Sequence, residues 1–120
     1  MQKLPSGVVV SGVCMGVKTV ENIDQKTGQI NNRLYVVLES DAANGVPGQK
    51  EYVEAEISRG LVDKGVPGRI AELRGKFLML PAYVRGWSGR NGIGLAYNLS
   101  NNTPNFLNPI EQPKADIKVA

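Results

Sequence analysis

The sequence predicts an all-β protein, a small five-stranded barrel with one short helix, and three observations lead to this class. Apolar and polar residues alternate over five segments, which is the pattern of strands that bury one face. Loops rich in glycine, proline and asparagine separate these segments, as expected for turns between strands. The chain has 120 residues, of which 42% are hydrophobic, so we expect one domain with a single modest core.

The first predicted strand covers residues 7–23 and is long for a protein of this size. Valine is its commonest residue, and β-branched residues favour extended backbone. Gly12 and Gly16 interrupt the valines, and glycine within a strand is typical of a bulge or a sharp bend. We therefore expect this strand to bend near Gly12 or Gly16, as the coiled wall of a small barrel requires.

Two shorter strands are predicted next, over residues 33–40 and 50–58, with a polar turn before the first and a loop between them. Alternation assigns one face of each strand to the core, namely Leu34, Val36, Leu38, Val53, Ala55 and Ile57. The opposite faces then carry Arg33 and Tyr35 on the first strand and Tyr52 on the second. The two tyrosines would lie next to one another on neighbouring strands, either as a cross-strand aromatic pair or as binding residues.

Residues 58–75 differ in character from the strands around them, because glycines and a proline precede the sequence Arg-Ile-Ala-Glu-Leu-Arg. They predict a loop followed by a short helix of about two turns. Ile70 and Leu73 would pack inward from this helix. Gly75 fits the residue that ends it, since glycine readily adopts the left-handed conformation found after helices.

A hairpin is predicted from strands at residues 76–87 and 92–100, because the Ser-Gly-Arg-Asn-Gly sequence between them suits a hairpin loop. Alternation assigns to the core Leu78, Leu80, Ala82, Val84, Ile93, Leu95, Tyr97 and Leu99. The opposite face of the first strand carries Tyr83, Arg85 and Trp87, with Arg90 at the hairpin tip. Residues 101–120 contain three prolines and four asparagines, which predicts an extended or disordered tail.

The order of elements is therefore three strands, a short helix and two more strands. This order, with a long and glycine-kinked first strand, matches the OB-fold, a small Greek-key barrel. An SH3-like barrel is the main alternative, but it usually has no helix at that point. We expect residues 1–100 to form the OB-fold domain and residues 101–120 to form the tail.

Several kinds of function are not expected from this composition. The chain contains no histidine, which removes the usual general base near neutral pH and the commonest metal ligand. Its single cysteine, Cys14, excludes an internal disulfide and a cysteine-cluster metal site, and its apolar neighbours predict a buried thiol. We therefore expect no enzyme activity, cofactor or metal, in a reduced, intracellular protein. No apolar run approaches the roughly 20 residues that a membrane helix needs.

Aromatic residues and cations share the outward faces, which is the pattern of a surface for single-stranded nucleic acid. Bases stack on aromatic rings while Arg and Lys neutralise phosphates, so such binding tolerates any sequence. The candidate binding residues are Lys18, Arg33, Tyr35, Tyr52, Lys76, Tyr83, Arg85, Trp87 and Arg90. Because the net charge is only +3, this function needs the cations to be clustered. Burial in a dimer is the alternative role for Trp87.

The chain resembles the small single-stranded-DNA-binding proteins of filamentous and related bacteriophages. The likeness covers residues 7–100 and lies in the chain length, the five-strand layout, and the outward aromatics with interspersed cations on hairpins. It implies an OB-fold protein that dimerises, binds single-stranded DNA cooperatively and serves phage or plasmid DNA replication in the cytoplasm of a bacterial host. It further implies stacking roles for Tyr35, Tyr52 and Trp87, and phosphate roles for Arg33, Arg85 and Arg90. RNA is the other possible ligand.

The alternative class is a protein-interaction module, a small β-barrel adaptor or assembly protein that places Trp87 and Tyr83 at a protein interface. The chain is also similar to bacterial housekeeping single-strand-binding proteins, which end in an acidic, phenylalanine-terminated tip that recruits partners. Here residues 101–120 carry two acids and two lysines, so the tail has no net charge. A partner-recruiting role is therefore not expected for this tail.

Overall fold

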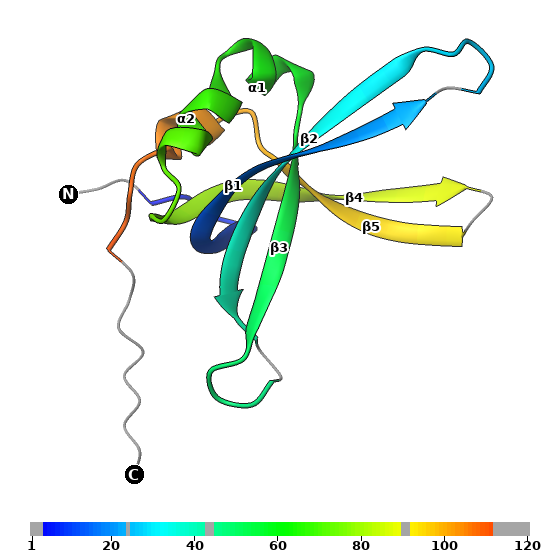
Figure 1. Ribbon diagram of the computed structural model, residues 1–120. Helices are drawn as coiled ribbons and strands as arrows, with labels where there is room; N and C mark the ends of the chain where they lie inside the picture. Colours follow the sequence, from blue (N-terminus) through cyan, green and yellow to red (C-terminus); the bar gives the residue numbers. More distant parts are fainter. Residues whose placement is uncertain (1–3, 24, 43–44, 90–91, 112–120) are drawn as a thin grey trace.

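Five strands form a closed barrel in the computed structural model, which describes residues 4–23, 25–42, 45–89 and 92–111. The strands are β1 (Val9–Ile23), β2 (Ile30–Asp41), β3 (Lys50–Ile57), β4 (Phe77–Gly89) and β5 (Gly92–Leu99). Their order around the barrel is β1-β2-β3-β5-β4, and β4 pairs back onto β1 to close it (Figure 1). The five predicted strands are therefore confirmed, with small shifts at their ends.

Strand β1 closes the barrel by pairing with two different strands. Its residues 9–13 pair with β4, and its residues 13–23 pair with β2. The pairing with β2 shifts register between Cys14 and Gly16. Close packing requires glycine at position 12, since a Cβ atom there would lie 2.6 Å from the carbonyl oxygen of Glu39. Figure 1 shows β1 turning sharply in this region. The bend predicted near the two glycines is thus confirmed.

Two short helices, α1 (Arg59–Asp63) and α2 (Val66–Glu72), connect β3 to β4 and lie over one end of the barrel (Figure 1). The prediction of a loop was wrong where α1 forms, because Leu61 is buried there and anchors a helical turn to the core. Helix α2 begins earlier than predicted, since Pro67 in its first turn fits the helical backbone. No helix in the described ranges is long and apolar enough to cross a membrane.

The core fills the barrel between the strands and the two helices. Ile70 and Leu73 of the helical segment are buried, as predicted. The other buried apolar residues that pack with them are Val10, Cys14, Val36, Leu38, Ala55, Ile57, Leu61, Val66, Leu78, Leu80, Ala82, Leu99 and Leu107. Alternation along the strands therefore assigned most of the inward faces correctly.

Three hairpins extend beyond the barrel: β1–β2, β2–β3 and β4–β5 (Figure 1). This extension corrects part of the predicted core, because Val84, Leu95 and Tyr97 are 46%, 77% and 44% exposed. Their positions alternate with the outward residues as predicted, but the strands continue past the point where the barrel can cover them. The side chain of Ile93, assigned to the same face, lies outside the described part of the chain.

The segment after β5 packs against the barrel and differs from the extended or disordered tail that we expected from residue 101. A short helix, η1 (Thr103–Phe106), follows β5, and both Phe106 and Leu107 are buried. The backbone N–H of Ile110 donates a hydrogen bond of 2.9 Å to the carbonyl of Phe77 at the start of β4. The apolar residues between the prolines and asparagines account for this docking. Residues 112–120 of the expected tail lie outside the described residues.

Candidate nucleic-acid interface

A row of five residues, one from each strand, crosses the outside of the barrel. In the strand registers Lys18 is opposite Tyr35, Tyr35 is opposite Glu56, Glu56 is opposite Asn98, and Asn98 is opposite Tyr83. Residues directly opposite one another in a sheet project from the same face. The row therefore joins residues from the whole length of the chain into one surface, with a tyrosine on each side of the central Glu56 and Asn98.

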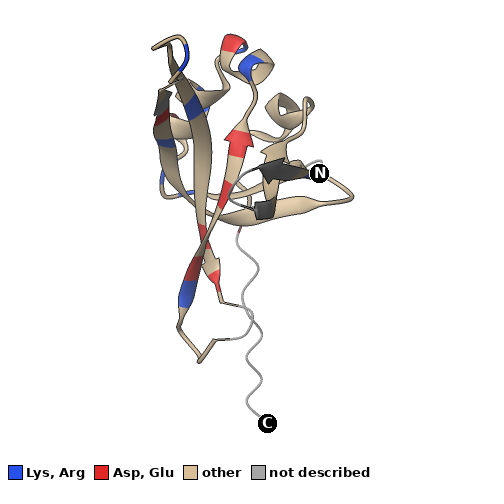
Figure 2. Cartoon of the chain, turned by 90° about the vertical axis from the view of Figure 1, so that its right-hand side faces the viewer, with Lys and Arg blue, Asp and Glu red and all other residues tan. Residues whose placement is uncertain are grey.

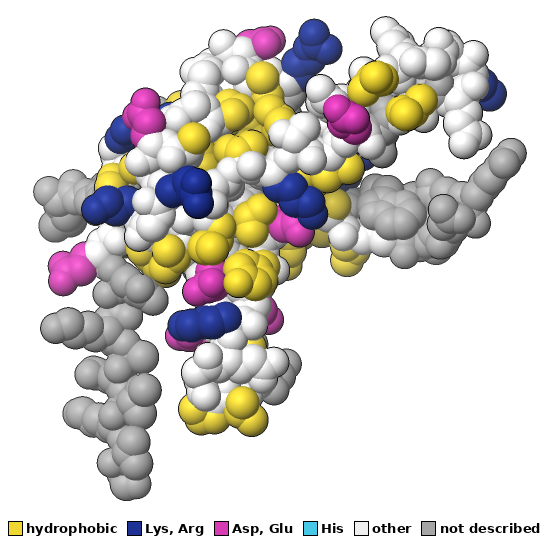
Figure 3. Space-filling model, viewed as in Figure 1, with side chains coloured by type: hydrophobic (Ala, Val, Ile, Leu, Met, Phe, Trp, Pro, Cys, Tyr) yellow, Lys and Arg dark blue, Asp and Glu magenta, His cyan; other side chains and the backbone are white. Residues whose placement is uncertain are grey.

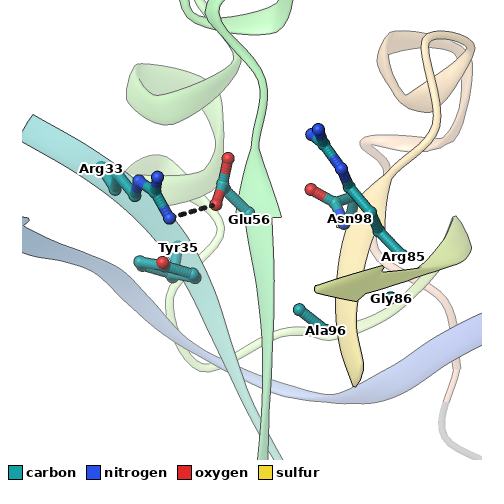
Figure 4. Close-up of a pocket in the computed structure, with 7 residues that line it drawn as sticks. All are labelled: Arg33, Tyr35, Glu56, Arg85, Gly86, Ala96 and Asn98. Carbon is teal, nitrogen blue, oxygen red and sulfur yellow. Dashed lines mark ion pairs between the residues drawn. The ribbon is translucent and has the colours of Figure 1, made fainter. Parts of the chain in front are cut away.

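A groove of about 570 Å³ lies over the middle of this row (Figure 4). Strands β2 and β3 supply one wall with Arg33, Tyr35 and Glu56, and strands β4 and β5 supply the other. The residues of this second wall are Arg85, Gly86, Ala96 and Asn98. Strand β3 pairs with β5 only through residues 55–56 and 97–98, so the sheet opens beside this short parallel contact. The volume is within the range of sites that hold small organic ligands.

Two guanidinium groups and one carboxylate set the charge of the groove. Arg33 Nη1 lies 3.9 Å from Glu56 Oε1, which is a loose, partly exposed ion pair. Arg85 is exposed and forms no ion pair among the described residues, so its charge is available to a ligand. The groove therefore combines a net positive charge with the ring of Tyr35 and with polar side chains on both walls.

The structure brings three of the predicted site residues, Arg33, Tyr35 and Arg85, into the same groove. Two more lie on the same row, since Tyr83 stands opposite Asn98 and Lys18 stands opposite Tyr35. Lys18 is engaged outside the groove, where its Nζ atom lies 2.8 Å from Glu54 Oε1. The predicted residues from β1, β2 and β4 therefore share one side of the barrel.

The other predicted residues lie elsewhere or outside the described part. Tyr52 is 61% exposed but stands opposite Glu39, so the predicted neighbourhood of Tyr35 and Tyr52 is wrong. It lies four residues along β3 from Glu56, about 13 Å away at the usual strand rise. Lys76 is exposed at the far end of β4 from the groove.

The tip of the β4–β5 hairpin holds the last two predicted residues. The backbone of Trp87 pairs with Gly94, two residues beyond Arg85 along β4. The side chain of Trp87 and the whole of Arg90 lie outside the described residues. The groove therefore borders the segment that carries the only tryptophan of the sequence.

Sequence reasoning missed Asn98 and did not assign Glu56 to the groove. Asn98 is a polar residue that is only 6% exposed, between the exposed Tyr97 and the buried Leu99. Its signal in the sequence was an asparagine inside an otherwise apolar strand. Glu56 was predicted to face outward, but its position beside Asn98 depends on the β3–β5 pairing, which periodicity does not specify.

The cations are not gathered into one large basic surface. Figure 2 shows basic and acidic positions interspersed along the strands, and β3 alone contributes Glu51, Glu54 and Glu56. On the face seen in Figure 3, Lys and Arg side chains are scattered among apolar and acidic ones. The clustering that we expected is therefore local, and it consists of the two arginines in the groove.

Cys14 is buried in the core, as predicted, with its Sγ atom 3.5 Å from the carbonyl oxygen of Ile70. Burial raises the pKa of the Cys14 thiol above its ordinary value, because the interior disfavours the charged thiolate. Cys14 therefore serves as a core residue here. Within the described ranges no group of three or more His, Cys, Asp or Glu residues is placed to hold a metal ion.

The fold and the groove together define a small β-barrel protein with an arginine- and tyrosine-lined surface, a class that includes binders of oligonucleotides. Residues 4–106 match the family described as "Putative Gamma DNA binding protein G5P". The chain therefore belongs to this family, the gene 5 single-stranded-DNA-binding proteins of filamentous phage, which confirms the resemblance noted above. No curated protein and no solved structure matches the chain. The family is one of DNA-binding proteins rather than enzymes.

Proposed function

We propose that this protein binds single-stranded DNA in the groove between the β2–β3 and β4–β5 walls, with little dependence on sequence. The observation that carries the proposal is the meeting of Arg33 and Tyr35 from β2 with Arg85 from β4 in one open groove. Membership in a DNA-binding family supports the same conclusion. In this proposal the protein serves phage or plasmid DNA replication in the cytoplasm of a bacterial host.

In this proposal the tyrosines stack with bases and the arginines neutralise phosphates. One base stacks on Tyr35, and the bound DNA continues from there toward Tyr83. Arg33 and Arg85 hold its phosphates on the two walls of the groove. Each stacked base contributes about 1–3 kcal/mol and tolerates any base, since every base has an aromatic face. In the same proposal, residues that do not line the groove have supporting roles along the bound DNA. They are Tyr52, Trp87, Lys18, Lys76 and Arg90.

We further propose that the barrel is an OB-fold. The order β1-β2-β3-β5-β4, the long β1 shared by both ends of the sheet, and the helices between β3 and β4 all support this assignment. The faces of β2 and β3 are the usual oligonucleotide surface of that fold. The groove, which β2 and β3 wall on one side, lies where such a surface is expected.

A homodimer is the proposed assembly, and the β4–β5 hairpin supports it. Val84 is opposite Tyr97 and Gly86 is opposite Leu95, so three exposed apolar side chains share one face of this ribbon. A two-stranded ribbon that leaves its apolar face in water is only marginally stable, which favours covering by a second copy. The groove residues Arg85 and Asn98 project from the opposite face, so DNA binding and dimerisation do not compete.

A titration with a dT oligomer tests the proposed function, with the intrinsic fluorescence of Trp87 as the signal. We expect quenching at low salt, and weaker binding by Arg85→Ala, which removes an unpaired groove cation. Arg69→Ala is the matched control, because Arg69 is an exposed cation on α2 that pairs with Glu72 at 3.1 Å, away from the groove. Equal binding by both variants would place the DNA elsewhere.

Failure of the oligomer to bind at low salt would contradict the DNA-binding proposal itself. The alternative function is then a protein-interaction module, and the exposed apolar face of the β4–β5 hairpin is the observation that favours it. A matching rU oligomer in the same titration separates a preference for DNA from one for RNA. Tighter binding of rU than of dT would reassign the ligand to RNA.

A further inference from the structure

Asn98 lines the groove although it is almost entirely buried. Its residue is 6% exposed, and its carboxamide makes no hydrogen bond within the part of the chain that the structure describes. Among the described residues no fully inaccessible side-chain nitrogen or oxygen lacks a partner, so the small accessible part of Asn98 includes its polar atoms. These atoms open into the groove, where they are free to bond with water or with a ligand.

Glu56 offers a complementary group at the same place. It is the residue directly opposite Asn98 in the short β3–β5 pairing, so the two side chains start one strand spacing apart. Figure 4 shows the Asn98 carboxamide directed toward Glu56 across the groove, while the Glu56 carboxylate is turned toward Arg33 and the Tyr35 ring lies on the Arg33 side. Within the described part of the chain Glu56 has one charged partner, Arg33 at 3.9 Å, which leaves carboxylate lone pairs free.

We propose that Glu56 and Asn98 read one base of the bound strand and prefer guanine at that position. The Watson–Crick edge of guanine has two adjacent N–H donors, N1–H and the N2 amino group, followed by the O6 acceptor. A carboxylate accepts from the two donors, and the Asn98 amide donates to O6. This inference rests on the proposed function, since the base reaches the groove as part of a bound strand. The remaining contacts stay independent of sequence.

The other bases satisfy this pair of groups less well. Thymine presents a single N3–H between two carbonyl oxygens, so with O4 accepting from Asn98 its O2 would face the Glu56 carboxylate. Cytosine and adenine each present one amino donor beside an unprotonated ring nitrogen, which also faces the carboxylate. A good two-bond contact to a base edge discriminates against the wrong base by roughly tenfold or more. The predicted preference at this position is therefore for guanine over the other three bases.

The test measures binding of short dT oligomers that carry one central guanine, adenine or cytosine, against the all-dT oligomer. We expect about tenfold tighter binding for the guanine oligomer. Glu56→Gln should lose the guanine preference, measured as the ratio of the affinities for the guanine oligomer and the all-dT oligomer. Asn98→Leu should also lose the guanine preference; its thermal unfolding, and that of Glu56→Gln, is followed to verify the fold.

Glu54→Gln is the matched control. Glu54 lies two residues from Glu56 on β3 and pairs with Lys18 outside the groove, so this variant removes the same charge and should keep the guanine preference. Equal binding of the natural protein to all four oligomers would overturn the proposal and leave the DNA-binding function intact. Absence of binding to any oligomer would instead contradict the function itself. A guanosine monophosphate that binds as tightly as the guanine oligomer would assign the site to a free nucleotide rather than to a strand.

Discussion

At the scale of single residues, Gly12 is the position where the barrel least tolerates a side chain. A Cβ atom there would lie 2.6 Å from the carbonyl oxygen and 3.0 Å from the carbonyl carbon of Glu39, both of which belong to the backbone of β2. Backbone atoms cannot move aside without disturbing the β1–β2 pairing. Gly12 also pairs with Leu78 of β4, so the β1–β2 and the β1–β4 pairings would both have to adjust.

We predict that Gly12→Ala lowers the free energy of unfolding by about 1–3 kcal/mol, the usual cost of forcing atoms into a packed site. Urea unfolding followed by circular dichroism measures this change. Gly60→Ala is the control, because nothing lies within 4 Å of the added Cβ in α1. There alanine should be neutral or stabilising by up to about 1 kcal/mol, since it favours helix over glycine. If Gly12→Ala leaves the free energy of unfolding unchanged, β1 and β2 are not tightly packed at Gly12.

The sequence indicated the face of most residues at this scale but not their neighbours. Period-two alternation placed Arg33, Tyr35 and Arg85 on the outside, and the structure confirms this. Alternation carries no information about register, so it could not show that Tyr35 is opposite Glu56 rather than Tyr52. Asn98 was missed for the same reason, because the parallel β3–β5 contact joins segments about 40 residues apart.

At the scale of elements, the β4–β5 hairpin shows why alternation alone overestimates a core. The pattern of Ala82, Val84, Leu95, Tyr97 and Leu99 is continuous, but only Ala82 and Leu99 lie where the barrel covers them. The hairpin continues outward with the same alternation, so one of its faces remains apolar and uncovered. The sequence predicted the strands correctly and could not predict where the barrel ends.

We predict that Leu95→Lys keeps the monomer folded and abolishes the proposed dimer. Leu95 is 77% exposed in the monomer, so the substitution should change its free energy of unfolding by no more than about 0.5 kcal/mol. A buried, unpaired lysine would be costly in a dimer interface. Sedimentation velocity of the two proteins measures the assembly state.

Val46→Lys is the matched control for this prediction, because Val46 is 71% exposed on the loop between β2 and β3. It should leave the assembly state of the protein unchanged. A natural protein that sediments as a monomer would contradict the dimer proposal. Dissociation by Val46→Lys alone would move the interface to the β2–β3 loop.

At the scale of the whole molecule, the charges favour a small number of strong phosphate contacts over a broad electrostatic attraction. The net charge is only +3, and acidic residues are interspersed with basic ones along the strands (Figure 2). Lys18, Lys50 and Arg69 are paired with carboxylates, which reduces what they can offer to DNA. In the proposed binding mode stacking therefore supplies a large share of the affinity, and we expect the dependence on salt to be shallow for a DNA-binding protein.

Salt titrations separate the two contributions. For a single strand, the logarithm of the binding constant falls with the logarithm of salt concentration by about 0.7 per neutralised phosphate. We predict that Arg33→Ala and Arg85→Ala each make this slope shallower by about 0.7. Tyr35→Ala should weaken binding by about 1–3 kcal/mol with no change of slope, because stacking releases no counterions. A changed slope in Tyr35→Ala, together with unchanged slopes in both arginine variants, would mean that the phosphates run along a different surface of the barrel.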